Sequence, residues 1–512
     1  MAGINELSDA AWRDDDLGFL LDLSGVPVAG GLLRALAADE ATWAPAFAAM
    51  AALEAGAVAN PDEGRQVGHY WLRDPDRAPN GLGREIRDTA EACRLLASDV
   101  HRSGSFDTAL ILGIGGSALG PQLVADALGE PDDRMRMLFL DNTDPDGFAR
   151  LLGPLDLERV LVVCISKSGG TAETRNALVE TKAAFARAEV DFDSHAVAVT
   201  GEGSALWHAA EGWRARLPMW DWVGGRTSVC SAVGLLPMFL QGVDVDAFLA
   251  GAASMDAATR APSLAANPAA RLAWAWHRLT EGRAARAMVV LPYRDRLVLL
   301  SRYLQQLVME SLGKELDRSG ARVRQGLTVY GNKGSTDQHA YVQQLRDGPD
   351  DTFVTFIGVL DDGWYGAEEV EPGLDSGDFL QGFLLGTRKA LQAQGRGTIT
   401  LLVEQIDAFH LGALVALFER SVGLYAERIG VNAYHQPGVE AGKKAAGAAL
   451  ALKAPLLAAL DETPRTAAEV SARALVEDAE TAWFLLTRLA INGRGVSRAP
   501  GDSPATDRFA RK

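Results

Sequence analysis

The chain has 512 residues, of which 48% are hydrophobic and 23% charged, and its formal net charge is −17. This length predicts several domains with large cores, and the acidic balance argues against a nucleic acid partner, whose binding depends on phosphate neutralisation. Three cysteines cannot form a disulfide framework or a metal-type pair, the acidic start predicts no signal peptide, and no apolar stretch predicts a membrane span, so we expect a cytoplasmic protein.

Residues 1–95 are rich in alanine and predict a helical N-terminal region. After residue 95, short apolar runs alternate with glycine or polar turns and with helical patterns; the runs are TALIL, RMLFL, VLVVCI and HAVAVT. Strand–turn–helix alternation is typical of a doubly wound parallel sheet with helices on both faces. We therefore predict a first α/β domain over residues 96–250.

A second series of strand-length runs follows, namely AMVVLP, QGLTVYG, TFVTFIGVL and TITLLVEQ. These predict a second doubly wound α/β domain over residues 284–450. Between its strands, SRYLQQLVMESLGKEL predicts one helix, because Leu304, Leu307, Val308 and Leu312 have the spacing of a single helix face.

The last sixty residues differ from the rest of the chain. Thr466 and Glu469 have the spacing of a capping box. Two helices joined by a short turn, within residues 455–497, resemble a winged-helix unit, but the second helix has few lysines or arginines, which favours packing over DNA binding. Residues 498–512 predict a flexible tail.

Two loops that follow strands of the first domain favour a phosphate ligand. In GIGGSALGP, the glycines around Gly116 and Ser117 let the backbone approach a ligand closely. In SKSGGT, the hydroxyls of Ser166, Ser168 and Thr171 precede a helix N-terminus, which attracts anions. The first loop is also a loose match to a dinucleotide-binding motif, and a capping loop without a ligand is the alternative for the second.

Four further segments present acid–base or charged groups. Arg226, in VGGRTS, is a candidate for stabilising a developing negative charge in a reaction. The alternative is an arginine in an ordinary surface salt bridge. Gln306 and Glu310 are four residues apart on the predicted helix, where a partly buried glutamate is a general base and an exposed one is merely solvated. His339 follows a polar loop and is a candidate acid–base group, with a purely structural histidine as the alternative. The segment NAYHQPGVEAGKK places Gln436 and Lys443 next to a turn.

Together, GIGGSALGP, SKSGGT, VGGRTS, MESLGK, DQHA and QPGVEAGK resemble the glucose-6-phosphate isomerase family, in that family's order. The ending AYHQPGVEAGKK and the extra C-terminal unit look like the bacterial branch. The resemblance implies two sugar-isomerase domains and reversible conversion of glucose 6-phosphate to fructose 6-phosphate through ring opening and a cis-enediolate. It implies no cofactor and no metal.

The resemblance also implies residue roles. Glu310 would move a proton between C2 and C1, and Arg226 would stabilise the enediolate. His339 and Lys443 would assist ring opening, with Glu173 orienting Lys443 and with His339 supplied by the neighbouring subunit of a homodimer. The sugar phosphate would be held by the remaining residues, with Lys167 acting mainly through its backbone N–H: Gly116, Ser117, Ser166, Lys167, Ser168, Thr171, Gln306 and Gln436.

Three alternatives remain at this point. A dual-specificity enzyme would also accept mannose 6-phosphate, and a non-catalytic sugar-phosphate sensor would need only the phosphate loops. An NAD-dependent oxidoreductase would explain the first glycine loop and leave the other five segments unexplained. The sequence also departs from common family patterns at SKSGGT, at Ala118 and at His435, which puts affinity and specificity in question but removes no proposed catalytic group.

Overall fold

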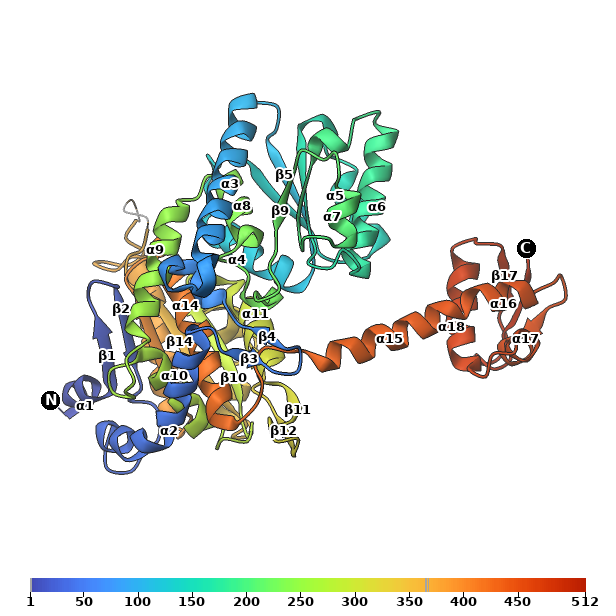
Figure 1. Cartoon of the computed structure of the whole chain (residues 1–512). Helices are drawn as coiled ribbons and strands as arrows, with labels where there is room; N and C mark the ends of the chain where they lie inside the picture. Colours follow the sequence, from blue (N-terminus) through green and yellow to red (C-terminus); the bar gives the residue numbers. More distant parts are fainter. Residues whose placement is uncertain (1, 364–365, 367) are drawn as a thin grey trace. The chain divides into compact units, whose positions relative to one another are not determined.

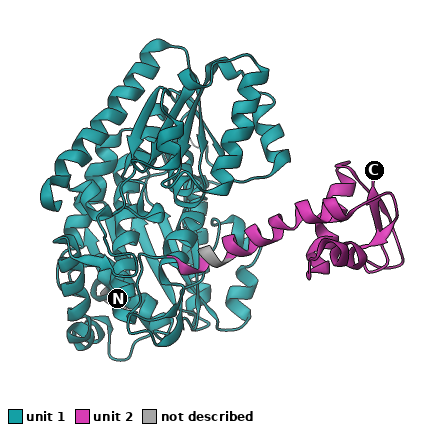
Figure 2. Cartoon of the chain, turned by 45° about the vertical axis from the view of Figure 1, so that its right-hand side comes forward, with its two compact units in different colours: residues 1–435 teal, residues 436–512 magenta. Residues whose placement is uncertain are grey.

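The computed structural model describes residues 2–363, 366 and 368–512, and the chain divides into two compact units, residues 1–435 and 436–512 (Figure 2). The division falls inside the predicted second domain, whose residues 436–450 therefore belong to the second unit. None of the described helices is long and apolar enough to cross a membrane.

The first sheet of unit 1 is entirely parallel, with the strand order β6-β5-β7-β8-β9. Its apolar runs are buried along their whole length in β5, β7 and β8, because helices cover both faces of a parallel sheet. Four of its five strands were predicted from the sequence, and the fifth, β9, was not. The strands are β5 (Thr108–Leu112), β6 (Arg136–Leu140), β7 (Val160–Ile165), β8 (Ala196–Thr200) and β9 (Ala215–Pro218).

The helices around this sheet arise from the segments between its strands and from the flanking chain (Figure 1). They are α3 (Leu82–Ser103), α4 (Leu119–Leu128), α5 (Pro145–Leu152), α6 (Ala172–Arg187), α7 (Ala205–Ala209) and α8 (Ala232–Gln241). Separate apolar clusters fill the two faces, one with α3 and α8 and the other with α5 and α6.

The four strands predicted within residues 284–450 are present and parallel to one another, but the second sheet is mixed because two N-terminal strands join it with antiparallel pairing, which the prediction lacked. Its order is β1-β2-β15-β14-β10-β13, in which β10, β13, β14 and β15 are parallel while β2 pairs antiparallel with β15. The bounds are β1 (Ala11–Asp14), β2 (Phe19–Asp22), β10 (Ala287–Tyr293), β13 (Val329–Tyr330), β14 (Thr352–Val359) and β15 (Thr398–Val403).

The N-terminal region is accordingly not all helical. Besides α1 (Ala2–Ala10) and α2 (Leu32–Glu54), it contributes the β1–β2 pair and a small hairpin of β3 (Val58–Asn60) and β4 (Arg65–Gln66). Strand β2 forms because Phe19 and Leu21 are buried while its backbone extends the edge of the second sheet. Such pairing depends on a partner almost 400 residues away, and residues 1–95 carry no local sign of it.

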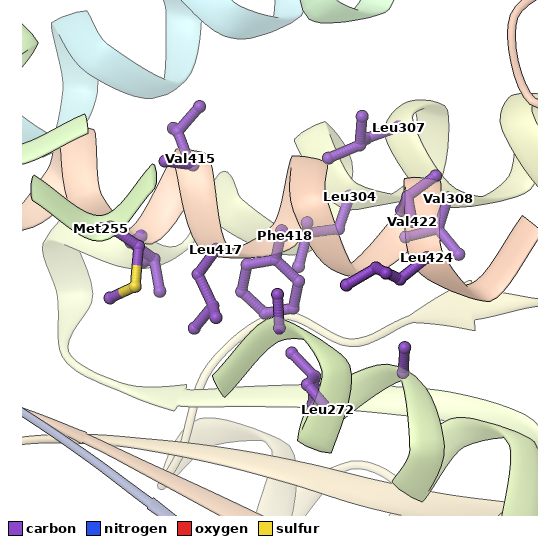
Figure 3. Packing of buried hydrophobic residues seen from close by; sticks show 14 of the residues in the cluster. Met255, Leu272, Leu304, Leu307, Val308, Val415, Leu417, Phe418, Val422 and Leu424 are labelled. Atoms are coloured by element: carbon purple, nitrogen blue, oxygen red, sulfur yellow. The ribbon is translucent and has the colours of Figure 1, made fainter. Parts of the chain in front are cut away.

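A long, buried helix, α14 (Ala408–Ile429), lies at the centre of the main core. It packs with α9 (Val245–Ala258), α10 (Pro268–Leu279) and the segment of α11 (Leu300–Leu304), as Figure 3 shows for Met255, Leu272, Leu304 and Phe418. Helices α12 (Val342–Asp347) and α13 (Ser376–Gln392) complete the second sheet's surroundings.

Unit 2 has a core of its own, built around Leu456, Val470, Leu486 and Phe509. A long first helix is followed by a three-stranded antiparallel sheet, in the order β16-β18-β17, and three helices. The elements are α15 (Pro437–Ala451), α16 (Lys453–Ala459), β16 (Arg465–Thr466), α17 (Ala467–Ala474), α18 (Ala479–Ile491), β17 (Val496–Ala499) and β18 (Arg508–Arg511).

Two predictions for this unit have clear outcomes. The capping box is confirmed: the Glu469 N–H donates to the Thr466 hydroxyl at 3.2 Å, and the Thr466 N–H donates to the Glu469 carboxylate at 2.7 Å. The prediction of a flexible tail over residues 498–512 is wrong, because β18 is the central strand of the sheet and its Phe509 and Ala510 are buried. The alternation of polar and apolar residues in RFARK is too short to predict a strand from the sequence.

Candidate functional site

The first sheet has a topological switch point between β5 and β7. The chain leaves β5 for β6 on one side of the sheet, and leaves β7 for β8 on the other. Ligands of such sheets bind at the carboxyl ends of the two strands where the order reverses. Both predicted phosphate loops, Gly113–Pro121 after β5 and Ser166–Thr171 after β7, lie at this point.

The first loop touches the arginine-bearing loop through its backbone. A Cβ atom placed on Gly116 would lie 2.0 Å from the carbonyl of Gly225 and 2.6 Å from the backbone nitrogen of Arg226. Gly115 has φ +58°, and a Cβ there would lie 2.9 Å from Nε2 of Gln306. Only glycines permit these approaches, so GIGGS, VGGRTS and Gln306 meet in one place.

The second loop is shaped by its own hydroxyls. The Gly169 N–H donates to Ser166 Oγ at 3.2 Å, and the Gly170 N–H donates to Ser168 Oγ at 3.1 Å. Ser166 is buried whereas Ser168 is exposed. Thr171 precedes α6 without using its side chain as a cap. The loop thus presents an exposed hydroxyl at a helix N-terminus, where partial positive charge favours an anion.

The Lys167 side chain does not point to solvent beside this loop. Its ammonium donates to the carbonyl oxygens of Asp221 at 2.9 Å and Val223 at 3.1 Å, and burial lowers the pKa of Lys167. This tether fixes the chain just before Gly224–Ser228. The lysine side chain therefore joins the phosphate loop to the loop that carries Arg226.

Arg226 is the centre of the site. Its guanidinium is buried, and Nε donates to Ser311 Oγ at 2.8 Å while Nη1 lies 3.2 Å from the Glu310 carboxylate. Nη2 donates to the carbonyl oxygen of His435 at 3.2 Å and to that of Ala433. A planar fork can hold several acceptors in fixed directions, so Arg226 joins the first sheet's loops to the segment that carries Glu310.

Glu310 ends a π-helical segment, Gln305–Glu310, which continues α11. The predicted continuous helix SRYLQQLVMESLGKEL is therefore wrong in two ways: this turn is wider than an α-turn, and Lys314–Leu316 is strand β11, paired with β12 (Arg322–Gln325). Leu307 and Val308 pack in the core with Val422 (Figure 3). Single π-turns are frequent at functional sites, and here the turn fixes its apolar residues in the core.

The Glu310 side chain is 19% exposed, which favours the partly buried alternative over the merely solvated one. Its Oε2 atom has no hydrogen-bond partner among the described residues, although Arg226 is within ion-pair distance. A partly exposed carboxylate held at a fixed place is suited to accept a proton from a carbon acid.

Sequence reasoning missed two residues beside Glu310, although both belong to MESLGK. Ser311 holds Arg226, as described above. Lys314 is buried, and its Nζ donates to the Glu310 carbonyl oxygen at 2.7 Å. Burial, reinforced by the neighbouring Arg226, lowers the pKa of Lys314 to about 7. A lysine four residues after a candidate base was the available signal.

The lowered pKa of Lys314 predicts a pH-dependent stability. The unfolded chain keeps the lysine proton up to about pH 10.5, whereas the folded chain releases it near 7, so Lys314 destabilises the fold below pH 7 and this penalty fades as pH rises toward 10.5. Relative to wild type, the free energy of unfolding of Lys314→Met should therefore be raised by about 3 kcal/mol more at pH 6 than at pH 9.

Thermal unfolding of both proteins at the two pH values checks this prediction. Lys512→Met, at an exposed lysine, is the control and should show no such trend. A difference in Tm between Lys314→Met and wild type that is the same at pH 6 and pH 9 would contradict it.

His339 lies in a short turn, Thr336–His339, and is exposed. The turn is held by buried Asp337, which accepts from the Asn332 N–H at 2.9 Å and from the Tyr341 hydroxyl. Gln338 donates to the Tyr293 hydroxyl at 3.1 Å and to the Phe383 carbonyl at 3.1 Å. The neighbours of His339 in the chain are thus held in place, while His339 itself is exposed.

Gln436 and Lys443 belong to unit 2, in and just before α15. Their relation to Glu310, and the expected approach of Lys443 to Glu173 on α6, therefore remain predictions. The structure brings together the two phosphate loops, Arg226, Gln306 and Glu310. No cluster of three or more potential metal-ligating side chains occurs among the described residues.

The chain is similar over most of its length to proteins of one family. A family model described as phosphoglucose isomerase matches residues 46–369 and 384–456. A glucose-6-phosphate isomerase of Geobacter sp. (strain M21) is 54% identical over 503 residues, covering 95% of this chain and 94% of its own. One of Synechococcus sp. (strain JA-3-3Ab) is 54% identical over 508 residues, covering 95% and 94%.

A solved structure is also similar. The crystal structure of a glucose-6-phosphate isomerase from Chlamydia trachomatis has a TM-score of 0.81 at 27% identity, covering 88% of this chain and 91% of that one. The ranges matched by the family model include all six sequence segments.

Proposed function

The chain belongs to the phosphoglucose isomerase family, and from this premise we propose how its residues perform the reaction. The protein is an aldose–ketose isomerase that interconverts glucose 6-phosphate and fructose 6-phosphate. The observation that carries the assignment of roles is the Arg226–Glu310 pair, 3.2 Å apart, beside two glycine-rich loops at the switch point of a parallel sheet.

The phosphate group is anchored at the start of α6. Backbone N–H groups of the Ser166–Thr171 loop and the Ser168 and Thr171 hydroxyls donate to its oxygens, and the helix N-terminus adds partial positive charge. Gly116 and Ser117 line the neighbouring loop. Lys167 contributes its backbone N–H, since its ammonium is bound to Asp221 and Val223. Gln306 and Gln436 position the sugar chain.

Glu310 then acts on the open-chain sugar. Its carboxylate removes the proton from C2 of glucose 6-phosphate, and the C1 carbonyl oxygen gains the negative charge of a cis-enediolate. The C2 hydroxyl then gives its proton to the C1 oxygen and becomes a carbonyl, while Glu310 returns the first proton to C1. The Arg226 guanidinium faces the developing oxyanion, where a fixed cation in a site with little water stabilises charge strongly. His339 and Lys443 open the pyranose ring beforehand, and Glu173 orients Lys443.

We propose a homodimer in which His339 serves the partner's site. The support comes from α13, which packs beside the His339 turn through Gln338 and leaves Phe383 and Leu385 each 43% exposed. Gly382 and Gly386 on the same helix have open space around them. Small residues between apolar ones allow two helices to approach closely, and the exposed histidine lies next to this face.

Complementation between two inactive variants tests this arrangement. Glu310→Gln and His339→Ala, unfolded and refolded together, should regain about a quarter of wild-type activity, because half of the dimers are mixed and one of their two sites is intact. Each variant refolded alone is the control. If His339 acts within its own subunit, the mixture stays inactive.

The reaction itself is tested by incubating the purified chain with fructose 6-phosphate in buffer with EDTA and measuring glucose 6-phosphate formation. Steady formation of glucose 6-phosphate supports the isomerase activity. Mannose 6-phosphate offered as a competing substrate distinguishes a dual-specificity enzyme from one that accepts only the glucose ester. Absence of conversion would favour a sugar-phosphate sensor.

We further propose two sugar-isomerase domains and a winged-helix-like C-terminal extension. The succession of α16, β16, α17, α18, β17 and β18, with β18 central in the sheet, supports the second of these. A cytoplasmic location is proposed as well, supported by three buried free thiols, which suit a reducing compartment.

A further inference from the structure

The last two helices of unit 2 leave large apolar side chains in solvent. Val470, Leu486 and Leu489 are buried in the core of the unit, whereas Leu475, Phe484 and Ile491 are 93%, 60% and 74% exposed. The isomerase site uses none of these three residues. Scattered exposed apolar residues are ordinary, so their pattern along α18 decides whether they mean anything.

That pattern is a single stripe with an ordered set of charges. Glu480, Phe484, Arg488 and Ile491 are all exposed and follow each other at intervals of four, four and three residues, which is one face of a helix. Glu480 and Arg488 each lie four residues from Phe484, about 6 Å along the axis. Neither forms a salt bridge with another residue in the part of the chain that the structure describes.

Such a stripe is complementary to itself. When a second copy of α18 lies antiparallel, with the two-fold axis at Phe484, Glu480 of each helix faces Arg488 of the other and the two Phe484 rings meet. Ile491 then lies opposite position 477, close to Leu475 at the end of α17. A two-fold contact requires this mirrored order of charges about an apolar centre. An unrelated partner protein would have to carry the complementary charges at the matching spacing around an apolar residue by chance.

We propose that α18 pairs antiparallel with α18 of a second copy of this chain, through Phe484 and two symmetric Glu480–Arg488 ion pairs. This surface lies in unit 2 and does not involve the α13 face of unit 1. The contact therefore acts in addition to the proposed dimer, and the two can fail separately.

Cross-linking of the full chain tests the pairing. Phe484→Cys places a thiol at the two-fold axis, while the three native cysteines, Cys93, Cys164 and Cys230, are buried. A bismaleimide of about 10 Å span should give a covalent dimer rapidly. Val179→Cys, at a residue 60% exposed on α6, is the matched control. Cross-linking of Phe484→Cys no faster than this control would overturn the proposal.

Exchanging the two charges tests whether the cross-linking depends on the Glu480–Arg488 ion pairs, which cross-linking by random collision would not. In the Phe484→Cys protein, Glu480→Arg or Arg488→Glu alone places like charges opposite each other and should slow cross-linking about tenfold. The two changes together restore opposite charges and should restore the rate. Isomerase activity should remain at the wild-type level throughout, which shows that the protein is folded. A double variant as slow as the single ones would also overturn the pairing.

Discussion

Replacing Glu310 by glutamine should lower kcat by about 10³- to 10⁴-fold while binding of fructose 6-phosphate weakens by less than about tenfold. Glutamine keeps the size of the side chain but cannot accept the C2 proton. The fold should survive, because Arg226 still has Ser311 and the carbonyl oxygens of Ala433 and His435 as acceptors. A coupled assay gives kcat, and calorimetry gives the binding constant.

The matched control is Glu315→Gln, five residues further along, where an exposed carboxylate pairs with Arg322. This variant should retain wild-type kinetics. Loss of binding in Glu310→Gln equal to its loss of turnover would indicate a damaged site rather than a missing base.

Arg226→Lys should lower kcat and kcat/KM together, by about 10²- to 10³-fold. A charge is kept, but an ammonium cannot reach Ser311, Glu310 and the 433–435 segment at once as the guanidinium fork does. Because the group is buried, the substitution should also cost about 3 kcal/mol of stability. Steady-state kinetics and thermal unfolding measure the two effects.

Arg102→Lys, at an exposed surface pair with Asp99, is the control and should change neither quantity. A raised KM with unchanged kcat in Arg226→Lys would mean that the arginine only binds substrate. The role in stabilising the enediolate would then be wrong.

Local patterns were enough to predict most of the strands and the two phosphate loops. TALIL and VLVVCI are almost entirely apolar and are buried over their full length, and the glycines that follow them allow sharp turns and close approaches of the backbone. Parallel strands bring their carboxyl ends to one edge, which made the approach of the two phosphate loops predictable. The contact of Gly116 with the Arg226 loop was not predictable in this way, because the strand before that loop, β9, was itself not predicted.

Other features depend on long-range contacts that no short segment encodes. Strand β2 exists because β15 offers an edge, and β18 exists because β16 and β17 do. The π-turn at Gln305–Glu310 has nearly the same apolar spacing as an α-helix, so periodicity could not reveal it. Lys314 looked like an ordinary charged residue until its burial beside Glu310 was visible.

The proposed mechanism requires the Glu310 carboxylate to carry the proton between the two sugar carbons. Glucose 6-phosphate deuterated at C2, followed by NMR, tests this directly. The wild-type enzyme should remove deuterium from C2 and deliver part of it to C1 of fructose 6-phosphate, whereas Glu310→Gln should leave C2 labelled. Loss of the C2 label at the wild-type rate in Glu310→Gln would contradict the account.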